Sequence, residues 1–499
     1  MYNNNSSYSQ GGSGKITVEV VEEQTGQVIS SRMRLTNADG KAVRIRGTLF
    51  ENGWTLLDGS LEYRGRVGDY SYRVSHGPQF ATGAGGFTLD TNSEAIDTLR
   101  LPRHADLASE NWYGGDLLTN LEVDQLARWL PADDLLMACQ VREQLSAVGG
   151  APESPKLING GAWAEGPSYL DNRSGSGGLL FHHWMPPAVV PDHVPSSRLL
   201  IMAKPQSSLA EVTMVSGEQA VHSEIQQLTA RDVPIWLASG RIDSIQVLSK
   251  YLNDEDRQPN QRVFFQPPGV AFKGALANGK LAEYLYWQVL EAGLRIPPSA
   301  GSGFGMQPTT LGYNRVYVQV AEKTGNAWWR GLRSGASFVT SGPLLRTNVN
   351  GWPPGHEFEI PPDGALELSI GTTLTVADPV EYLDVVFNGQ TVYSAQLDEW
   401  AKQGGKIPPL KITESGWMLV RVVTGRTHTY RIASTAPYYF QIAGQPRISR
   451  SAVALFQAWL QACREDLNSE SEELQTTSAP FLKAAEDFWQ QQFDRATVP

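Results

Sequence analysis

The chain has 499 residues, which is too long for one ordinary domain and predicts two to four domains. Apolar residues make up 41% and charged residues 19%, a balance that supports packed cores and argues against extended disorder. The formal net charge is −11 and no cluster of Lys and Arg is visible along the sequence, so the composition disfavours nucleic acid as a partner.

The N-terminal part of the chain alternates apolar and polar side chains over short stretches. Residues 1–14 are rich in Asn, Ser and Gly and are predicted to be disordered. Residues 16–21 alternate, and Asp39-Gly40 is a strong hairpin signal. We therefore expect a small β-sandwich over residues 15–102.

Residues 103–345 change character, because apolar runs alternate with helical stretches. This βα alternation predicts an α/β domain with parallel strands, and a barrel suits its size. The expected strands include residues 135–139, 199–203, 235–238 and 316–320, and the expected helices include residues 121–130 and 281–292.

Strand-like alternation returns over residues 346–446 and predicts a second β-sandwich. Its clearest element is a hairpin of residues 383–387 and 390–393 around Asn388-Gly389.

The last part of the chain, residues 447–499, is predicted to be helical. Apolar side chains recur at helical spacing along a first helix, and a second helix is expected to open at Ser478 with Pro480 in its first turn. The stripe of the first helix consists of Phe456, Trp459, Leu460 and Cys463. Cys463 and Cys139 are expected to be two buried thiols rather than a disulfide or a metal site.

Four groups of segments carry a resemblance to a known family. They are residues 110–120, residues 232–240 with 243–245, residues 293–302 with 312–317, and residues 328–344. Together they resemble the CehA/McbA (carbaryl-hydrolase-like) branch of the PHP metallohydrolase superfamily, over most of the chain from about residue 15. The resemblance implies a PHP-like distorted (β/α) barrel between a carboxypeptidase-regulatory-like β-sandwich and a second sandwich, followed by helices.

The family's metal-binding positions do not match. In relatives the first active-site strand ends Gly-Asp-Leu-His-x-His, whereas residues 115–120 read Gly-Asp-Leu-Leu-Thr-Asn. The two histidine positions are thus Leu118 and Asn120, and two further ligand positions fall at Gln226 and Tyr251. Leucine has no lone pair, and neutral amides are weak ligands for Zn, Mn or Fe. We therefore expect no catalytic residue, no metal and no cofactor, with Zn, Mn or Fe as the alternative if the site is rearranged.

Other polar residues near these positions could still line a pocket. They are Asp116, His222, Asp243, Arg295, Ser299, Ser302, Asn314 and Arg315. Asp116 is expected to keep a structural hydrogen bond, and His222 is the best candidate for a stray ligand. Arg295 and Arg315 either hold an anionic or polar ligand or fasten loops through carbonyls and carboxylates.

A group of acidic residues that follows the first active-site strand in sequence has two interpretations. Glu122, Asp124, Asp133 and Asp134 follow Asp116 in sequence. They could supply oxygen ligands to Mg or Ca, but such charges more often cap or coat a helix.

Three functions follow as hypotheses. The first is a catalytically degenerate family member that acts as a binding or scaffold protein for an unknown small-molecule or protein ligand. The alternative is an active metal-dependent hydrolase of ester, carbamate or phosphoester bonds with a rearranged site. A third is a carbohydrate- or surface-binding protein, suggested by the sandwiches and the 14 Trp. We expect no membrane span, no signal peptide and a cytoplasmic location.

Overall fold

The computed structural model describes residues 12–143, 153–157, 161–173, 177–186, 189–205, 220–254, 258–402 and 404–499. The chain divides into two compact units: Met1–Asp106 with Arg128–Asp134, and Leu107–Ala127 with Leu135–Pro499. Most of the segment predicted to be disordered lies outside the described residues, and Ser13 and Gly14 already belong to the first strand.

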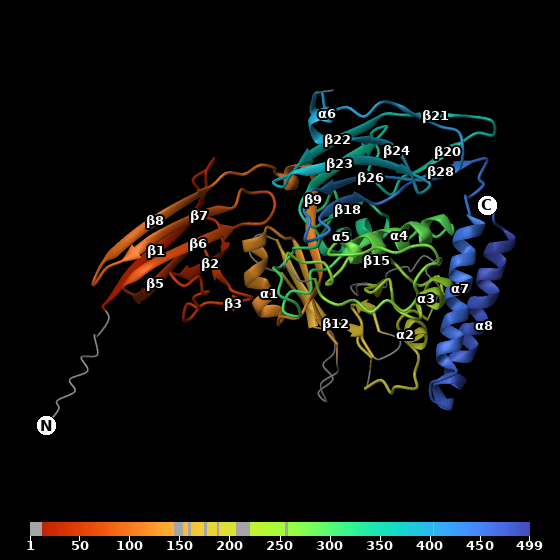
Figure 1. Cartoon of the computed structure of the whole chain (residues 1–499), viewed down its shortest axis with the longest axis horizontal. Helices are drawn as coiled ribbons and strands as arrows, with labels where there is room; N and C mark the ends of the chain where they lie inside the picture. The colour runs from red at the N-terminus through yellow and green to blue at the C-terminus, as the bar shows by residue number, and fades with distance from the viewer. Residues whose placement is uncertain are drawn as a thin grey trace. The chain divides into compact units, whose positions relative to one another are not determined.

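The first unit is a β-sandwich, drawn in red to orange in Figure 1. Its strands are β1 (Ser13–Glu22), β2 (Ser31–Asn37), β3 (Phe50–Glu51), β4 (Trp54–Leu57), β5 (Ser60–Arg66), β6 (Gly68–Ser75), β7 (Gly83–Leu89) and β8 (Glu94–Leu101). One sheet has the order β5-β1-β8 and the other the order β3-β4-β2-β6-β7. Ile16, Val18 and Val20 alternate inward along β1 and share one core with Met33 and Leu35 of the other sheet. The period-two pattern of this segment is therefore confirmed.

A large mixed sheet runs through the second unit. Its first strands are β9 (Trp112–Thr119), β10 (Met137–Arg142), β11 (Glu153–Leu157), β12 (Trp163–Asp171), β13 (Leu179–His182), β14 (His222–Ile225), β15 (Ser244–Leu248), β16 (Pro298–Ala300), β17 (Arg315–Gln319) and β18 (Ser337–Thr340). The path runs β16-β15-β14-β13-β12-β10-β9-β17-β18 and continues through β27 (Ile432–Thr435), β26 (Gly416–Thr424), β23 (Val380–Phe387) and β24 (Gln390–Ala395).

The predicted α/β barrel is wrong. The path of the sheet is open, ending at β16 on one side and at β24 on the other. Antiparallel ladders join β12, β13 and β14, and also β9, β17 and β18, which breaks the expected βα alternation. Among the described residues strands take 37% and helices only 22%. Two apolar runs read as strands are in fact the helices α2 (Ser196–Ala203) and α3 (Val233–Ala238), because runs of four or five apolar residues do not distinguish the two periods.

The second half of this unit forms a β-sandwich with its own core. Its further elements are β19 (Leu344–Val349), β20 (Glu357–Ile360), β21 (Leu366–Leu368), β22 (Ile370–Thr375), β25 (Leu410–Ile412), β28 (Tyr438–Ile442) and the helix α6 (Leu397–Lys402). Leu383 of β23 and Met418 of β26 lie in this core. The predicted hairpin is confirmed, since Asn388 and Gly389 have φ of 49° and 72°, as a type I′ turn requires.

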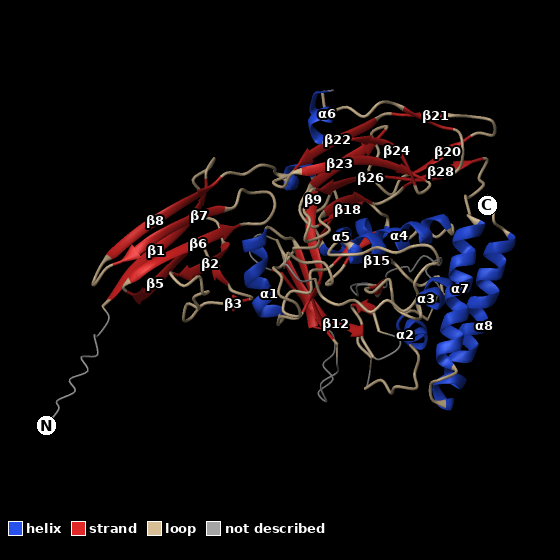
Figure 2. Cartoon of the chain, in the orientation of Figure 1, coloured by secondary structure: helices blue, strands red, loops and turns tan. Residues whose placement is uncertain are grey.

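Helices cover part of the second unit, as the blue ribbons of Figure 2 show. They are η1 (Leu107–Glu110), α1 (Val123–Trp129), α4 (Ala277–Glu291), α5 (Gly325–Arg333), α7 (Arg450–Leu467) and α8 (Glu472–Asp494); η2 (Leu130–Asp133) belongs to the first unit. The buried stripe predicted for α7 is confirmed, and the Phe456 ring stacks on Trp489 of α8 at 4.8 Å between ring centroids. None of the described helices is long and apolar enough to cross a membrane.

The predicted start of the last helix is wrong. Helix α8 begins at Glu472, where the Ser471 side chain accepts a hydrogen bond from the backbone N–H of Leu474. A serine cap followed by two glutamates favours this earlier start, and Pro480 then lies inside the helix.

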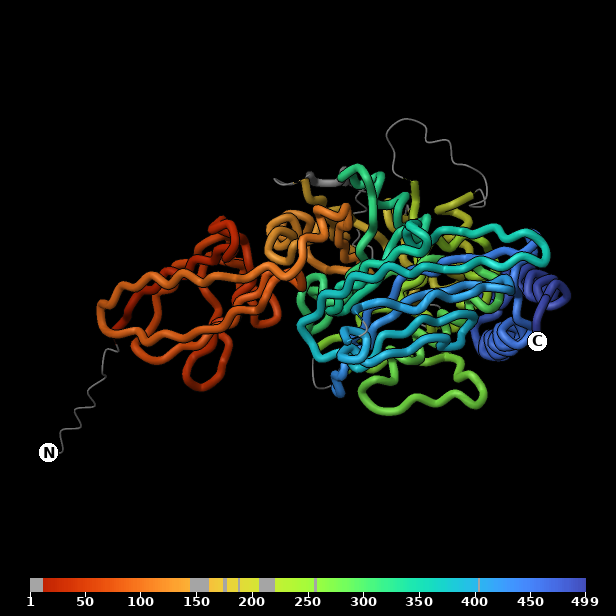
Figure 3. The backbone as a smooth tube through the Cα atoms, turned by 90° about the horizontal axis from the view of Figure 1, so that it is seen from above, coloured from red at the N-terminus to blue at the C-terminus, as the bar shows by residue number. Residues whose placement is uncertain are grey.

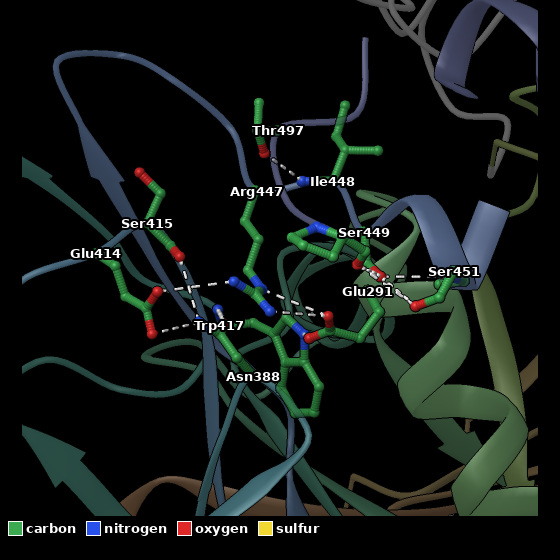
Figure 4. Close-up of polar contacts among 12 residues, drawn as sticks. Glu291, Asn388, Glu414, Ser415, Trp417, Arg447, Ile448, Ser449, Ser451 and Thr497 are labelled. Carbon is green, nitrogen blue, oxygen red and sulfur yellow. Dashed lines mark hydrogen bonds and ion pairs between the residues drawn. The ribbon is translucent and has the colours of Figure 1, made fainter. Parts of the chain in front are cut away.

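A buried carboxylate fastens the C-terminal segment to α4 (Figure 4). Glu291 accepts hydrogen bonds from Trp417 Nε1 at 2.9 Å and Arg447 Nη2 at 3.3 Å, and its carbonyl accepts from the N–H of Ser449 at 2.7 Å. In Figure 3 the sandwich strands (cyan to blue) run side by side towards the C-terminal helices (dark blue). The last helices are therefore joined to the sandwich and to α4 by polar contacts as well as by apolar packing.

Candidate functional site

Asp116 is the polar centre of the strand that carries the family resemblance. It lies on β9, its side chain is fully buried, and its carboxylate accepts hydrogen bonds from the N–H groups of Ser302 at 2.9 Å, Gly312 at 2.8 Å and Leu118 at 3.2 Å. The hydroxyl of Ser302 also donates to it. Burial raises the pKa of Asp116 to about 6, and the hydrogen bonds from Ser302, Gly312 and Leu118 oppose the rise. Asp116 thus holds the segment after β16 against β9, as a structural hydrogen-bond acceptor.

This buried carboxyl predicts a pH dependence of stability. Its pKa is about 6 in the folded state and 3.8 for the free side chain, so between these two values the native protein retains a proton that the unfolded chain releases. The contribution of this group to the unfolding free energy is therefore fully present below about pH 4 and is lost as the pH rises through 6. Denaturant unfolding at a series of pH values should show this component in the wild type and not in Asp116→Asn. Identical pH profiles for the two proteins would contradict it.

Leu118 fills the first of the lost metal-binding positions with apolar contacts. Its side chain is fully buried and packs with Val141, Leu170 and Leu180, with Met306 at the edge of the cluster. These residues come from β10, β12, β13 and the segment after β16. The end of β9 is therefore closed by hydrocarbon where the resemblance places an imidazole.

Asn120 and Gln226, at the second and third lost metal-binding positions, differ in exposure. Asn120 is exposed, and its N–H donates to the carbonyl of Phe304 at 2.8 Å. Gln226 is 1% exposed; its N–H donates to the Gly178 carbonyl at 2.7 Å, and its side-chain Nε2 has no hydrogen-bond partner within the described residues. Asn120 therefore lies at the surface, whereas the Gln226 side chain is enclosed.

Tyr251 stands at the fourth lost metal-binding position and forms a hydrogen bond to a neighbouring side chain. Its hydroxyl donates to Gln227 Oε1 at 3.0 Å, and burial raises its pKa to about 12, so the hydroxyl stays neutral. The adjacent Lys250 is buried and forms an ion pair with Glu143 at 3.1 Å. Lys250 and Glu143 neutralise each other, so both charges beside the fourth position are used in a structural pair.

His222 belongs to a separate polar group that is fully buried. Its Nε2 lies 2.8 Å from Ser244 Oγ, which donates to Glu224 Oε2 at 2.9 Å. His182 Nε2 lies 3.8 Å from the same carboxylate oxygen, and both imidazoles contact the Trp329 ring. Burial is the main reason why the pKa of His222 lies well below its usual value, and nearby cations lower this pKa further. The ring is therefore neutral. None of these side chains reaches solvent, so the group cannot contact an external substrate.

Most of the remaining predicted pocket residues are engaged in structural contacts. Asp243 accepts from Lys204 Nζ at 2.7 Å, and Ser299 is fully buried. Asn314 donates to backbone carbonyls after β15. Arg315 donates to the Gly312 carbonyl at 2.6 Å, and Arg295 pairs with Glu357 at 2.7 Å. The two arginines therefore fasten loops through a carbonyl and a carboxylate.

The residues present do not fit a catalytic metal at these positions. A leucine, an asparagine, a buried amide and a hydrogen-bonded neutral tyrosine offer neither the negative charge nor the imidazole and carboxylate ligands that Zn, Mn or Fe requires. Within the described residues no group of three His, Cys, Asp or Glu side chains could hold a metal ion. Two of the acidic residues are engaged in structural contacts: Glu122 accepts from Gln140 at 2.9 Å, and Asp133 pairs with Arg32.

Several residues of the site were missed from the sequence. Glu224 of β14 and Ser244 of β15 are two of them, and alternation along these short strands was the only sign of their polar side. Gln227 follows the lost ligand position Gln226 in sequence, and its Oε1 accepts the hydrogen bond from the Tyr251 hydroxyl.

Comparisons with known proteins leave the family open. No family model matches the chain, and no curated protein matches it. Among solved structures, the Bacillus anthracis TIE protein is 16% identical over 22% of this chain and 19% of that one, with a TM-score of 0.16. A pilus-presented adhesin (Spy0125, Cpa) is 16% identical over 19% of this chain and 28% of that one, with a TM-score of 0.14. The N-terminal four Ig domains of Dscam1 isoform 7.44 are 9% identical over 87% of this chain and 72% of that one, with a TM-score of 0.14. The chain thus spans less than a third of the length of the first two.

Proposed function

We propose that the chain is a catalytically inactive relative of the carbaryl-hydrolase-like PHP branch and acts as a binding or scaffold protein. The observation that carries the proposal is the packing of Leu118 into a closed apolar cluster at the end of β9. The contacts of Tyr251 with Gln227 and of Lys250 with Glu143 support it, because they use the neighbouring polar groups in structural pairs.

Chemistry gives a second reason. Hydrolysis of an ester, carbamate or phosphoester near neutral pH needs an activated water or a nucleophile with a base in reach. The buried imidazoles of His182 and His222 are enclosed, and Asp116 is engaged by its hydrogen bonds. These groups support the fold and offer no open position for a substrate.

Metal content tests the proposal directly. The full chain, purified without chelator, should contain no stoichiometric Zn, Mn or Fe by elemental analysis. A chelator should change neither its thermal unfolding nor its hydrolysis of a nitrophenyl ester above the buffer rate. Stoichiometric metal whose removal abolishes esterase activity would overturn the proposal and favour the active hydrolase.

Leu118→His should harm the fold rather than restore a site. An imidazole in a fully buried apolar cluster lacks hydrogen-bond partners, so we expect a loss of about 2–4 kcal/mol in the unfolding free energy. Leu118→Met, which keeps volume and hydrophobicity, should cost less than about 1.5 kcal/mol. Both values come from denaturant unfolding. Adding Zn should not stabilise Leu118→His/Asn120→His, and a zinc-dependent gain in stability would argue for a site that can be rebuilt.

A further inference from the structure

The fold assembles a basic cleft that the sequence does not show as a cluster. In the N-terminal sandwich, Arg44, Arg46, Arg64 and Arg66 line one cleft of about 670 Å³, together with Tyr63 and Tyr70. The first pair follows β2, and the second pair lies on β5, so the two are separated by about twenty residues in sequence but not in space. We name this feature the arginine cleft.

The arginine cleft keeps its positive charge available. All four guanidinium side chains belong to exposed residues, and within the described part of the chain none of them forms an ion pair. Glu62 is the acidic residue of the lining, and it pairs with Lys15 at 3.3 Å. The Arg44 guanidinium lies 5.8 Å from the centre of the Phe50 ring, which leaves its charge in place. Four exposed cations at one place make a locally positive surface on a chain of net charge −11, so the cleft favours an acidic partner.

One wall of the cleft is a free strand edge. Strand β5 ends its sheet and pairs only with β1 among the described strands. The N–H of Val67 donates to Gly12, and the N–H of Val20 donates to the carbonyl of Gly59. Odd-numbered residues of β5 therefore bond to β1, and the N–H and C=O groups of even-numbered residues point away from the sheet. The carbonyl of Arg66 accepts the Tyr70 hydroxyl at 3.0 Å, so the stretch of edge open to a new strand runs from Ser60 to Arg64.

The spacing of the arginines matches an extended peptide. Arg64 and Arg66 lie two residues apart on one face of β5, at a repeat of about 6.8 Å along the strand. Alternate side chains of a paired peptide strand repeat at the same distance and lie directly opposite. A polypeptide can also pair with the free N–H and C=O groups, which a sugar or a nucleic acid cannot do in register.

The tyrosines do not offer a stacking surface for bases. Tyr70 meets Tyr63 edge to face at 5.3 Å and stacks on Phe87 at 5.3 Å, so the rings are engaged with each other. The Tyr70 hydroxyl donates to the carbonyl of Arg66 at 3.0 Å. Both rings therefore serve to shape the cleft.

We propose that the arginine cleft binds an extended acidic segment of a partner protein, which adds a strand to the edge of β5 and places alternate carboxylates on Arg64 and Arg66. Arg44 and Arg46 face the same segment from the other wall. The proposal concerns the first unit alone and does not depend on the absence of catalysis in the second.

Fluorescence anisotropy with the full chain tests this binding. The probe is a fluorescein-labelled peptide of alternating Glu and Thr, and its counterpart replaces every Glu with Gln. We expect saturable binding of the first peptide that weakens with salt, and at least about tenfold weaker binding of the second. Arg64→Glu/Arg66→Glu should weaken the binding of the acidic peptide by at least about tenfold. Arg64→Gln/Arg66→Gln should weaken this binding by less.

Matched control variants test whether peptide binding depends on the arginine cleft or only on the overall charge of the sandwich. Arg73→Glu/Arg100→Glu removes two exposed arginines from β6 and β8 of the same sandwich and should leave affinity within about twofold. Circular dichroism of each variant checks that the sandwich is folded. A peptide with N-methyl groups at alternate residues loses the backbone pairing and should bind at least about tenfold more weakly.

Other outcomes overturn the proposal. No saturable binding, or equal weakening by the cleft and control variants, would show that no specific site exists. An undiminished affinity of the N-methylated peptide would exclude strand addition. Tighter binding of a sulfated oligosaccharide or a single-stranded oligonucleotide of equal charge would show that the cleft takes another polyanion.

Discussion

Asp116→Ala is expected to lower the unfolding free energy of the second unit by about 3–5 kcal/mol. Alanine leaves three backbone N–H groups and one hydroxyl without their acceptor in a site closed to solvent. Each buried group that loses its partner costs about 1–3 kcal/mol, and the costs are not additive because the loop carrying Ser302 can shift. Tryptophan fluorescence during denaturant unfolding measures the loss, since most tryptophans belong to the second unit.

Two further variants bracket this result. Asp116→Asn keeps the shape and one acceptor oxygen, so we expect an intermediate loss of about 1–3 kcal/mol. Glu359→Ala removes an exposed carboxylate from β20 and should stay within about 0.5 kcal/mol of the wild type. A loss below about 1 kcal/mol for Asp116→Ala would mean that the released donors find new partners and that Asp116 does not organise this region.

The parts of the fold that were predictable are those set by local chemistry. Alternation over residues 16–21 and the Asn388-Gly389 turn each determine a structure within a few residues, and both are found. The stripe of α7 is similar, because helical spacing repeats over several turns.

The barrel prediction failed where local pattern is ambiguous. Residues 199–203 and 235–238 are apolar on all sides, as both buried strands and buried helices can be. Strand direction is also not a local property, so the antiparallel ladders of β13 with β12 and β14 were not predictable from composition.

The candidate site was likewise predictable only in part. The position of Leu118 on β9 and a structural role for Asp116 could be proposed from the sequence. What surrounds Leu118 could not, because Val141, Leu170 and Leu180 come from three other strands. The arginine cleft is equally non-local, since two short Arg-x-Arg segments become one surface only when the sandwich closes.

Arg421→Met should be comparably destabilising, by about 3–5 kcal/mol, because it removes the cation that two buried carboxylates share. Arg421 on β26 donates to Asp384 Oδ2 at 2.9 and 3.1 Å and to Glu283 Oε2, and its guanidinium lies 5.0 Å from the centre of the Trp287 ring. Tyr430 also donates to Glu283 at 2.8 Å. Methionine can replace the packing of the side chain but leaves both carboxylates, only 8% and 4% exposed, without a counter-ion.

A double-mutant cycle shows whether charge is the cause. Denaturant unfolding of Arg421→Met, Glu283→Gln and the double variant gives the coupling between the two side chains. If uncompensated charge dominates, Glu283→Gln should cost less in the Arg421→Met background than in the wild type, and lowering the pH should recover part of the loss. Additive losses with no pH recovery would instead assign the cost to packing against Trp287. Because Arg421 joins β26 of the sandwich to α4, a large coupling would show that this ion pair stabilises the contact between the two elements.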